Sequence, residues 1–321
     1  MRAHRTALAA LTTALVATGC APVTADDVQG GPRPVGEVTM VVPFGAGGGS
    51  DIAGRAMAAG LTAADPTLSI TVDNREGGQG AVGYSYFLGK RGSTHHLLAT
   101  ETSLLSLPAG IDVAFSHRDF TPIAKVGEDY TLLVARPGSP ITSCADAVEQ
   151  SKQRRVLAGI SGALGPDAVV FTLMQRRAGA DFDRVPYQSG SETMAAVLGG
   201  HVELASLNPS EVIGQLRSGR LTALCAFAPQ RYHYPELAHI PTAAEQGVPV
   251  SFAQFRGVIA PGGLDPRARQ YWIDLARRYA ASPAYTDYVE SEYLQPVTAF
   301  GDEFTAYLRD NQRLLADVVG R

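Results

Sequence analysis

Short apolar runs alternate with helical segments along most of this chain, and that alternation constrains its fold more than any other feature. Val38–Val42 has the length and composition of a buried strand, and residues 50–63 place small apolar side chains at helical spacing. The same order recurs in the second half, where residues 156–159 precede a helix beginning at Pro166. Strands that alternate with helices are typical of α/β proteins with largely parallel sheets. The sequence therefore predicts an α/β fold.

The other expected elements continue this pattern. Strands are expected at residues 69–72, 97–100, 130–135, 201–205, 221–227 and 252–260. Helices are expected at residues 81–88, around Met194–Leu198 and Val212–Leu216, and in two closing segments, Ala268–Leu275 and Phe304–Val318.

Length and charge bound the class of protein. A chain of 321 residues with 45% hydrophobic side chains can form one large α/β unit or two ordinary domains. Its 27 Lys and Arg residues face 31 Asp and Glu residues, for a formal charge of −4. This balance lacks the basic excess typical of nucleic-acid-binding proteins, so no nucleic-acid partner is predicted.

The N-terminus has the features of an export signal. Arg2 and Arg5 precede a short apolar run at residues 7–17, which is too short to span a bilayer. Thr-Gly-Cys then ends at Cys20, and this resembles a bacterial lipobox whose cysteine is acylated. We therefore expect residues 1–19 to be a signal peptide, Cys20 to be lipidated and residues 20–36 to be a flexible tether. Ordinary signal cleavage is the alternative; with lipidation, the protein is anchored at the extracytoplasmic face of the cell membrane.

Two cysteines remain after Cys20, and their state is open. Export makes a disulfide between Cys144 and Cys225 feasible, whereas two unpaired buried thiols fit the sequence equally well. No His or Cys pair has zinc-like spacing, so no metal is predicted.

A glycine-rich loop after the first strand is the strongest functional feature. It runs from Pro43 to Asp51 and includes Gly47 and Gly48 before a helix capped by Ser50 or Asp51. Glycines let the backbone approach a ligand, and a helix N-terminus favours an anion. A tight turn without a ligand is the alternative, but the run of small residues is longer than a turn needs. The loop is predicted to bind an anion.

A second loop, Gly78–Gly83, reads G-x-G-x-x-G, with Glu101 about 20 residues on. A dinucleotide site is disfavoured because the loop is lengthened and an exported protein meets no nicotinamide pool. No cofactor is predicted. We instead expect this loop to face the same crevice as the first.

Further polar loops follow strands in the second half. They contain Ser161, Tyr187 and Asn208, and ligands of open α/β sheets bind at the carboxyl ends of strands. A nucleophile elbow is absent, since Ala163 stands where G-x-S-x-G needs glycine. Asp167 and Glu101 have no recognisable acid/base partner in the sequence.

These residues together resemble a known family. In order along the chain the resemblance rests on Val42-Pro43-Phe44 with Gly47, Gly48 and Asp51, on Asp73-Asn74-Arg75 with Gly77, Gly80, Ala81 and Gly83, on Val185-Pro186-Tyr187 with Gly190, on Leu198-Gly199-Gly200, Asn208 and Gly219-Arg220-Leu221, and on residues 241–247. From Val38 to the last helix the chain resembles the substrate-binding proteins of tripartite tricarboxylate transporters, also called Bug-type extracytoplasmic solute receptors.

The resemblance implies a receptor without enzymatic activity. It implies a fold like type II periplasmic binding proteins, with two lobes, each a central sheet flanked by helices, and the ligand in the cleft between them. Residues 37–132 with 257–321 would form lobe 1, and residues 133–256 lobe 2. The ligand would be a small carboxylate, either a di- or tricarboxylate, an acidic amino acid or an aromatic acid. A monomer would deliver it to integral-membrane transporter subunits.

Matching positions of the family supply the expected ligand contacts, with Glu101 added from its place after the third strand. They are Phe44, Gly47, Gly48, Ser50, Asp51, Gly80, Ala81, Glu101, Ser161, Tyr187 and Asn208.

Some residues depart from the family pattern. Residues 91–96 replace its usual Asp-Gly-Tyr-Thr turn, and Gln188 stands for its usual lysine. Glu101 would repel a ligand carboxylate or accept a hydrogen bond from a ligand amine. An exported hydrolase using Ser161 or Asp167, and a receptor feeding a sensor kinase, are the alternatives.

Overall fold

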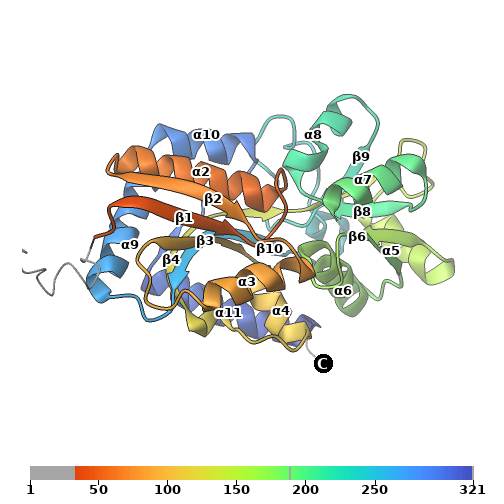
Figure 1. Cartoon of the computed structure of the whole chain (residues 1–321). Coiled ribbons are helices and arrows are strands. Elements are labelled where there is room, and N and C mark those ends of the chain that lie inside the picture. The colour runs from red at the N-terminus through yellow and green to blue at the C-terminus, as the bar shows by residue number, and fades with distance from the viewer. Residues whose placement is uncertain (1–32, 188, 320–321) are drawn as a thin grey trace, which may run out of the picture. The chain divides into compact units, whose positions relative to one another are not determined.

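The computed structural model describes residues 33–187 and 189–319. The expected signal peptide, Cys20, most of the expected tether and Gln188 lie outside the described residues. Two sheets with helices around them organise the described chain (Figure 1). This is the α/β architecture that the alternating sequence pattern predicts.

The first sheet has six strands in the order β11-β4-β10-β3-β1-β2. Strands β1, β2 and β3 run parallel, whereas β10 is antiparallel to both β3 and β4. The strands are β1 (Gly36–Val42), β2 (Leu68–Asn74), β3 (His96–Glu101), β4 (Phe120–Tyr130), β10 (Ala253–Pro261) and β11 (Ala299–Phe300).

Helices cover both faces of this sheet because its strands are apolar on both sides. Met40 and Val42 of β1 pack in one core cluster with α2, α9 and α10. Val41, on the opposite face, packs in another cluster with α3, α4 and α11. The helices are α2 (Gly49–Ala64), α3 (Ala81–Leu88), α4 (Ser103–Gly110), α9 (Pro266–Ala280), α10 (Pro283–Ser291) and α11 (Asp302–Val319).

The second sheet has five strands in the order β7-β6-β8-β5-β9. Strand β6 is parallel to β7 and β8, and β5 is antiparallel to β8 and β9. Its elements are β5 (Leu132–Ala135), α5 (Cys144–Gln153), β6 (Leu157–Ile160), α6 (Pro166–Ala178), β7 (Asp183–Pro186), α7 (Gly190–Gly199), β8 (Leu204–Leu207), α8 (Pro209–Arg217) and β9 (Thr222–Ala226). Short 3₁₀ turns occur at Gly78–Gly80, His117–Asp119 and Ala244–Gln246.

The chain passes from one sheet to the other at Thr131, so the single strand expected at residues 130–135 is wrong. β4 ends at Tyr130 in the first sheet, and β5 begins at Leu132 in the second. The Thr131 carbonyl accepts a hydrogen bond from the Phe227 backbone N–H at 2.9 Å, and its hydroxyl accepts one from Ser206 at 2.6 Å. The chain returns between β9 and β10, which begins at Ala253. The chain therefore crosses between the sheets at two places: between β4 and β5, and between β9 and β10.

Several elements were not predicted from the sequence, and β4 shows why. Charged residues interrupt its apolar pattern, yet its side chains are buried. Lys125 and Glu128 pair there at 2.6 Å, and Glu128 also accepts a hydrogen bond from Tyr130 at 3.0 Å. Pairing lowers the cost of burying these charges. The hydrophobic pattern of the sequence does not reveal this pairing, so the strand was not predicted. The unpredicted elements are β4, α4, α5, β7, α10 and β11; β8 also lies three residues later than its expected start.

Proline and polar caps set where several helices begin. Pro166, Pro209, Pro266 and Pro283 stand at the starts of α6, α8, α9 and α10, where the missing N–H costs nothing.

A disulfide joins Cys144 to Cys225, with a Cα–Cα distance of 5.9 Å. Both residues are buried, and the bond links the start of α5 to β9. The structure thus answers a question that the sequence left open.

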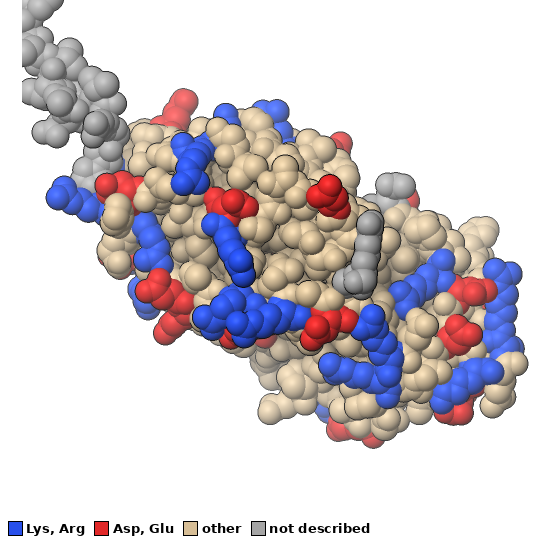
Figure 2. Space-filling view, turned by 90° about the horizontal axis from the view of Figure 1, so that it is seen from below, with Lys and Arg blue, Asp and Glu red and all other residues tan. Residues whose placement is uncertain are grey.

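Charged side chains of both signs share the surface. On the face in Figure 2, Lys and Arg side chains lie among Asp and Glu side chains. Exposed ion pairs such as Arg309–Asp310, at 3.0 Å, each contribute little stability.

Candidate functional site

A cleft of about 820 Å³ lies between the two sheets and is lined by residues of both. Six loops reach it, and each follows the carboxyl end of a parallel strand, where α/β proteins bind ligands. They follow β1, β2 and β3 in the first sheet and β6, β7 and β8 in the second; the lining segments are residues 44–50, 76–80, 101–103, 161–167, 189–192 and 206–211.

The glycine-rich loop after β1 is shaped from beneath by Asp51. The Asp51 carboxylate accepts hydrogen bonds from the Gly47 N–H, Arg55 Nε and Asn74 Nδ2, each at 2.9 Å. Burial opposes its ionisation, but hydrogen bonds from Arg55, Gly47 and Asn74 outweigh burial and hold the pKa of Asp51 below its usual value. Asp51 is buried and does not line the cleft, so its geometry is that of a loop support.

The N-terminus of α2 opens into the cleft. Gly48 is the N-cap residue, and it makes no side-chain capping bond. The first N–H groups of a helix have no acceptor within the helix, and they carry a partial positive charge. Gly48, Gly49 and Ser50 all line the cleft. This end of α2 can therefore receive an anion.

The loop after β2 reaches across the cleft. Gln79 has a left-handed backbone, with φ of 58°, and its Oε1 accepts a hydrogen bond from the Leu164 N–H of the second sheet at 3.4 Å. Gly80 lines the cleft next to Phe44, whereas Ala81 is the first residue of α3 and does not line it.

Arg256 lies at the floor of the cleft, and sequence reasoning missed it. It is 5% exposed, and its Nη2 lies 2.7 Å from Asp129 Oδ2. Its Nη1 donates to Ser50 Oγ at 3.3 Å, beside the open end of α2. A guanidinium therefore stands beside the backbone N–H groups at the start of α2.

Burial disfavours the Arg256 charge, but the Asp129 carboxylate outweighs burial, so the pKa of Arg256 is raised above its usual value. The arginine therefore stays charged at any physiological pH. One sequence signal could have found it. Gln254 and Arg256 are polar residues at alternate positions in an otherwise apolar strand, so they share one face of β10.

Glu101 completes this buried group from β3. It is 3% exposed; its Oε2 accepts from Gln254 Nε2 at 2.9 Å, and its Oε1 accepts from the Ser103 N–H at 3.0 Å. Gln254 Oε1 in turn accepts from Arg256 at 3.3 Å. The three strands β3, β10 and β4 thus place Glu101, Arg256 and Asp129 side by side.

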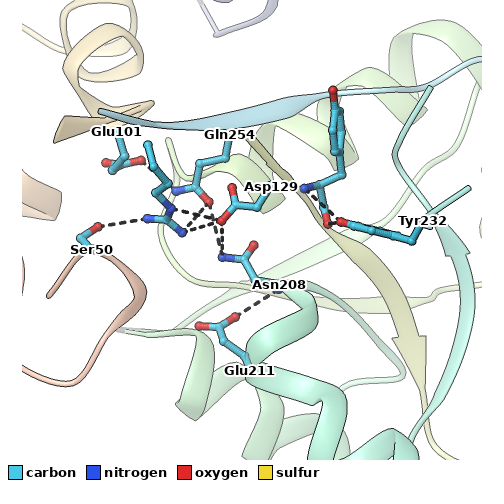
Figure 3. Close-up of polar contacts among 9 residues, drawn as sticks. Ser50, Glu101, Asp129, Asn208, Glu211, Tyr232 and Gln254 are labelled. Carbon is cyan, nitrogen blue, oxygen red and sulfur yellow. Dashed lines mark hydrogen bonds and ion pairs between the residues drawn. The ribbon is translucent and has the colours of Figure 1, made fainter. Parts of the chain in front are cut away.

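The second sheet meets this group through Asn208, which follows β8. Its Nδ2 donates to Asp129 Oδ2 at 3.4 Å and to Gln254 Oε1 at 3.5 Å, both long contacts (Figure 3). Its backbone N–H donates to Glu211 at 3.2 Å, within a capping box at the start of α8. Asn208 therefore bridges the second sheet to the floor formed by the first.

Ser161 and Asp167 form a pair at the start of α6. Asp167 Oδ2 accepts hydrogen bonds from the Ser161 hydroxyl, at 2.9 Å, and from the Ser161 N–H, while its Oδ1 accepts from the Ala168 N–H at 2.9 Å. Burial raises the pKa of the Asp167 carboxyl above its usual value, although these hydrogen bonds oppose the shift.

The structure gathers most of the expected contacts, and their role in binding stays a prediction. Tyr187 lies elsewhere: its N–H donates to the Ile160 carbonyl at 2.8 Å, and its ring packs on the core of the second sheet. Asp51, Ala81 and Tyr187 do not line the cleft; Phe44, Gly47, Gly48, Ser50, Gly80, Glu101, Ser161 and Asn208 do. Arg256, Gln254 and Glu211 are additional lining residues, and Asp129 pairs with Arg256 without lining the cleft.

Within residues 33–187 and 189–319, no group of three or more His, Cys, Asp or Glu side chains is placed to hold a metal ion. In the same ranges, no helix combines the length and apolar character that crossing a membrane requires.

Two helix-flanked sheets with a loop-lined cleft between them define an α/β protein of the periplasmic binding type. The model of the tripartite tricarboxylate transporter family receptor matches residues 55–319, so the chain belongs to this family of receptors. The protein BugT of Bordetella pertussis is 30% identical over 314 residues, which cover 93% of this chain and 91% of BugT.

Solved structures share the fold at lower identity. Rpa4515 of R. palustris with adipate superposes with a TM-score of 0.80 and 23% identity, over 90% of this chain and 99% of that chain. MatC from Rhodopseudomonas palustris with bound malate has a TM-score of 0.77 and 21% identity, over 89% of this chain and 99% of that chain.

Proposed function

We propose that this protein is an extracytoplasmic receptor that captures a small carboxylate between its two lobes and delivers it to a tripartite tricarboxylate-type membrane transporter. The observation that carries the proposal is the uncapped N-terminus of α2 in the cleft, with the buried Arg256 guanidinium beside Ser50. Helix dipole, free N–H donors and a fixed positive charge all favour one carboxylate group at this point.

The family and its relatives support a carboxylate as ligand. The family model is that of a transporter receptor, and two proteins of the same fold have adipate and malate in their structures. Capture would proceed by closing the lobes about the crossings at Thr131 and between β9 and β10.

The rival proposal is an exported hydrolase that uses Ser161. The serine hydroxyl donates to Asp167, and no histidine is among the described residues that line the cleft. A serine nucleophile needs an adjacent base to take its proton. Asp167 already accepts three hydrogen bonds from Ser161 and Ala168, two of them from backbone N–H groups. The arrangement therefore favours binding over turnover.

A thermal-shift screen of the full chain tests the proposal. The panel holds mono-, di- and tricarboxylates, amino acids, aromatic acids and neutral sugars. A ligand at 100 times its dissociation constant stabilises the folded state by about 2.7 kcal/mol. A hit that weakens in Ser50→Ala, and not in the matched control Ser218→Ala on the exposed end of α8, supports the receptor. Product formation that is lost in Ser161→Ala would instead favour the hydrolase.

Anchoring through Cys20 is part of the proposal. The segment ending in Thr18-Gly19-Cys20 resembles a lipobox, and residues 20–36 would tether the monomeric receptor to the membrane. Detergent phase partition of cells expressing the full chain tests this: the native protein should enter the detergent phase, and Cys20→Ala should not. Detergent partition of both forms, or of neither, would reject the anchor.

A further inference from the structure

The charges that line the cleft are unevenly matched. In the described part of the chain, five carboxylates line it, whereas Arg256 is the one cation among the lining residues. Arg256 is itself paired with Asp129. The second carboxylate of a dicarboxylate ligand would be repelled by this excess of negative charge, because the described lining residues include no second positive group. The carboxylates are Glu76, Glu101, Asp167, Glu192 and Glu211.

The helix ends of the second lobe are already occupied by acids of this chain. Asp167 accepts backbone N–H bonds at the start of α6, and Glu211 accepts one at the start of α8. A third acid, Glu192, stands in the first turn of α7. These carboxylates fill the positions in which a ligand anion would otherwise be held. At the start of α2, in the first lobe, no side chain caps the helix, and Gly48, Gly49 and Ser50 line the cleft.

Glu211 faces the open cleft. Its side chain is exposed to the cleft, and Oε2 receives the Asn208 N–H at 3.2 Å. Its Oε1 lies 2.5 Å from where a Cβ would be at Gly190, so the glycine leaves the space that this carboxylate occupies. Loss of surrounding water raises the pKa of the Glu211 carboxyl, although the Asn208 N–H and the Arg256 charge oppose the shift.

A second, independent observation points to a polar ligand. Ser106 on α4 lines the cleft and is 0% exposed, and its Oγ has no hydrogen-bond partner among the described residues. Buried hydroxyls are rarely left unpaired in folded proteins. The cleft thus holds a polar atom for which the described residues supply no partner.

We infer that the ligand is an amino acid whose charges are separated: its single carboxylate lies at α2 and Arg256, and its ammonium group lies at Glu211 and the acids around it. The inference rests on the proposed function and narrows its substrate class. An ammonium donates up to three hydrogen bonds to carboxylates. The negative charge in the cleft attracts it, whereas the same charge would repel a second carboxylate of the ligand.

Matched ligands test the inference by isothermal titration of the full chain. Hexanoate, 6-aminohexanoate and adipate share one chain length and differ only at the far end, and the corresponding sets from four to eight carbons cover other separations. The expected result is that one ω-amino acid binds at least tenfold more tightly than the monoacid and the diacid of its length. Equal or tighter binding of the diacids or monoacids overturns the inference and leaves the proposed receptor standing. If no member of any set binds, the inference is overturned, and the carboxylate receptor itself is contradicted only if the tricarboxylates and aromatic acids of the thermal-shift panel also fail.

A charge-neutral variant locates the ammonium. Glu211→Gln keeps an oxygen for the Asn208 N–H and removes the charge, so ω-amino acid binding should fall at least tenfold while diacid binding rises. Glu149→Gln on the exposed side of α5, outside the cleft, is the matched control. Melting curves show whether each variant folds, and Glu192→Gln serves as a second variant if Glu211→Gln does not. Equal losses for all ligands would contradict the assigned position.

Discussion

Arg256 and Glu101 stand directly opposite each other on the antiparallel strands β10 and β3, yet the arginine makes its ion pair with Asp129. Cross-strand neighbours of opposite charge usually pair with each other. Here Gln254 lies between them, donating to Glu101 at 2.9 Å and accepting from Arg256 at 3.3 Å. The floor of the cleft is therefore a connected polar group in which Arg256 is oriented toward Ser50 and α2.

The buried pair gives the first prediction. Arg256→Met should lower the free energy of unfolding by about 3–5 kcal/mol, because it leaves the Asp129 carboxylate buried without its counter-charge. Asp129→Asn combined with Arg256→Met should recover most of that loss, since the uncompensated charge is gone. Urea denaturation of the two single variants and the double variant measures the coupling. Additive effects of the two changes would contradict a tightly coupled pair.

The disulfide gives the second prediction. The bond between Cys144 and Cys225 spans 81 residues of sequence, so it restricts the unfolded chain strongly. Replacing both cysteines with alanine should lower the free energy of unfolding by about 4 kcal/mol from loop closure. Because neither cysteine lines the cleft, ligand binding should survive below the new melting temperature. An unchanged denaturation midpoint in reducing buffer would argue against this bond.

The third prediction concerns a close approach of two helices. At Gly60 in α2, an added Cβ would lie 2.1 Å from the ring of Tyr279 in α9, which is buried. Gly60→Ala should destabilise the protein by about 1–3 kcal/mol through overpacking, although alanine favours helix.

Gly214 supplies the matched control. It lies in α8, and an added Cβ would meet nothing within 4 Å. Gly214→Ala should therefore stabilise the protein by about 0.5–1 kcal/mol. Thermal melting of both variants distinguishes packing from propensity: the two shifts should have opposite signs.

Local sequence was enough to predict the loops of the site, and it was insufficient for the floor. Gly47, Gly48 and Ser50 are recognisable because a glycine run between strand and helix has a direct conformational meaning. The Arg256–Asp129 pair joins residues 127 positions apart, and it depends on the register of β10 against β4. Single-sequence patterns carry no information on that register, so the charge at the floor could not be predicted.

Tyr187 and Asp51 show the converse case. Both occupy positions that the family resemblance associates with ligand, and neither lines the cleft in this chain. Asp51 is held by Gly47, Arg55 and Asn74, and Tyr187 packs on the second core. The same stretch of sequence can hold a residue that shapes a binding loop and a residue that touches the ligand. Only the direction of the side chain distinguishes these two roles.

The last prediction concerns how Asp65 affects the stability of the folded protein at acidic pH. Its carboxylate joins Arg33, Thr67 and Tyr271. Asp65 is 6% exposed and accepts hydrogen bonds from Thr67 Oγ1 at 2.7 Å, Tyr271 Oη at 2.7 Å and Arg33 Nη2 at 2.8 Å. Hydrogen bonds from Thr67 and Tyr271 hold the pKa of Asp65 well below its usual value.

A carboxyl whose pKa is lowered by folding stabilises the protein above its unfolded pKa, near 4, and loses that contribution as pH falls through the folded value. Asp65→Asn should therefore cost about 1–3 kcal/mol above about pH 5, and its difference from the native protein should shrink below about pH 4. Tyr271→Phe, which removes one donor, should show a smaller difference over the same range. Chemical denaturation between pH 3 and pH 7 measures both curves. A deficit in Asp65→Asn that stays constant down to pH 3 would mean that the lost interaction does not depend on the carboxylate charge.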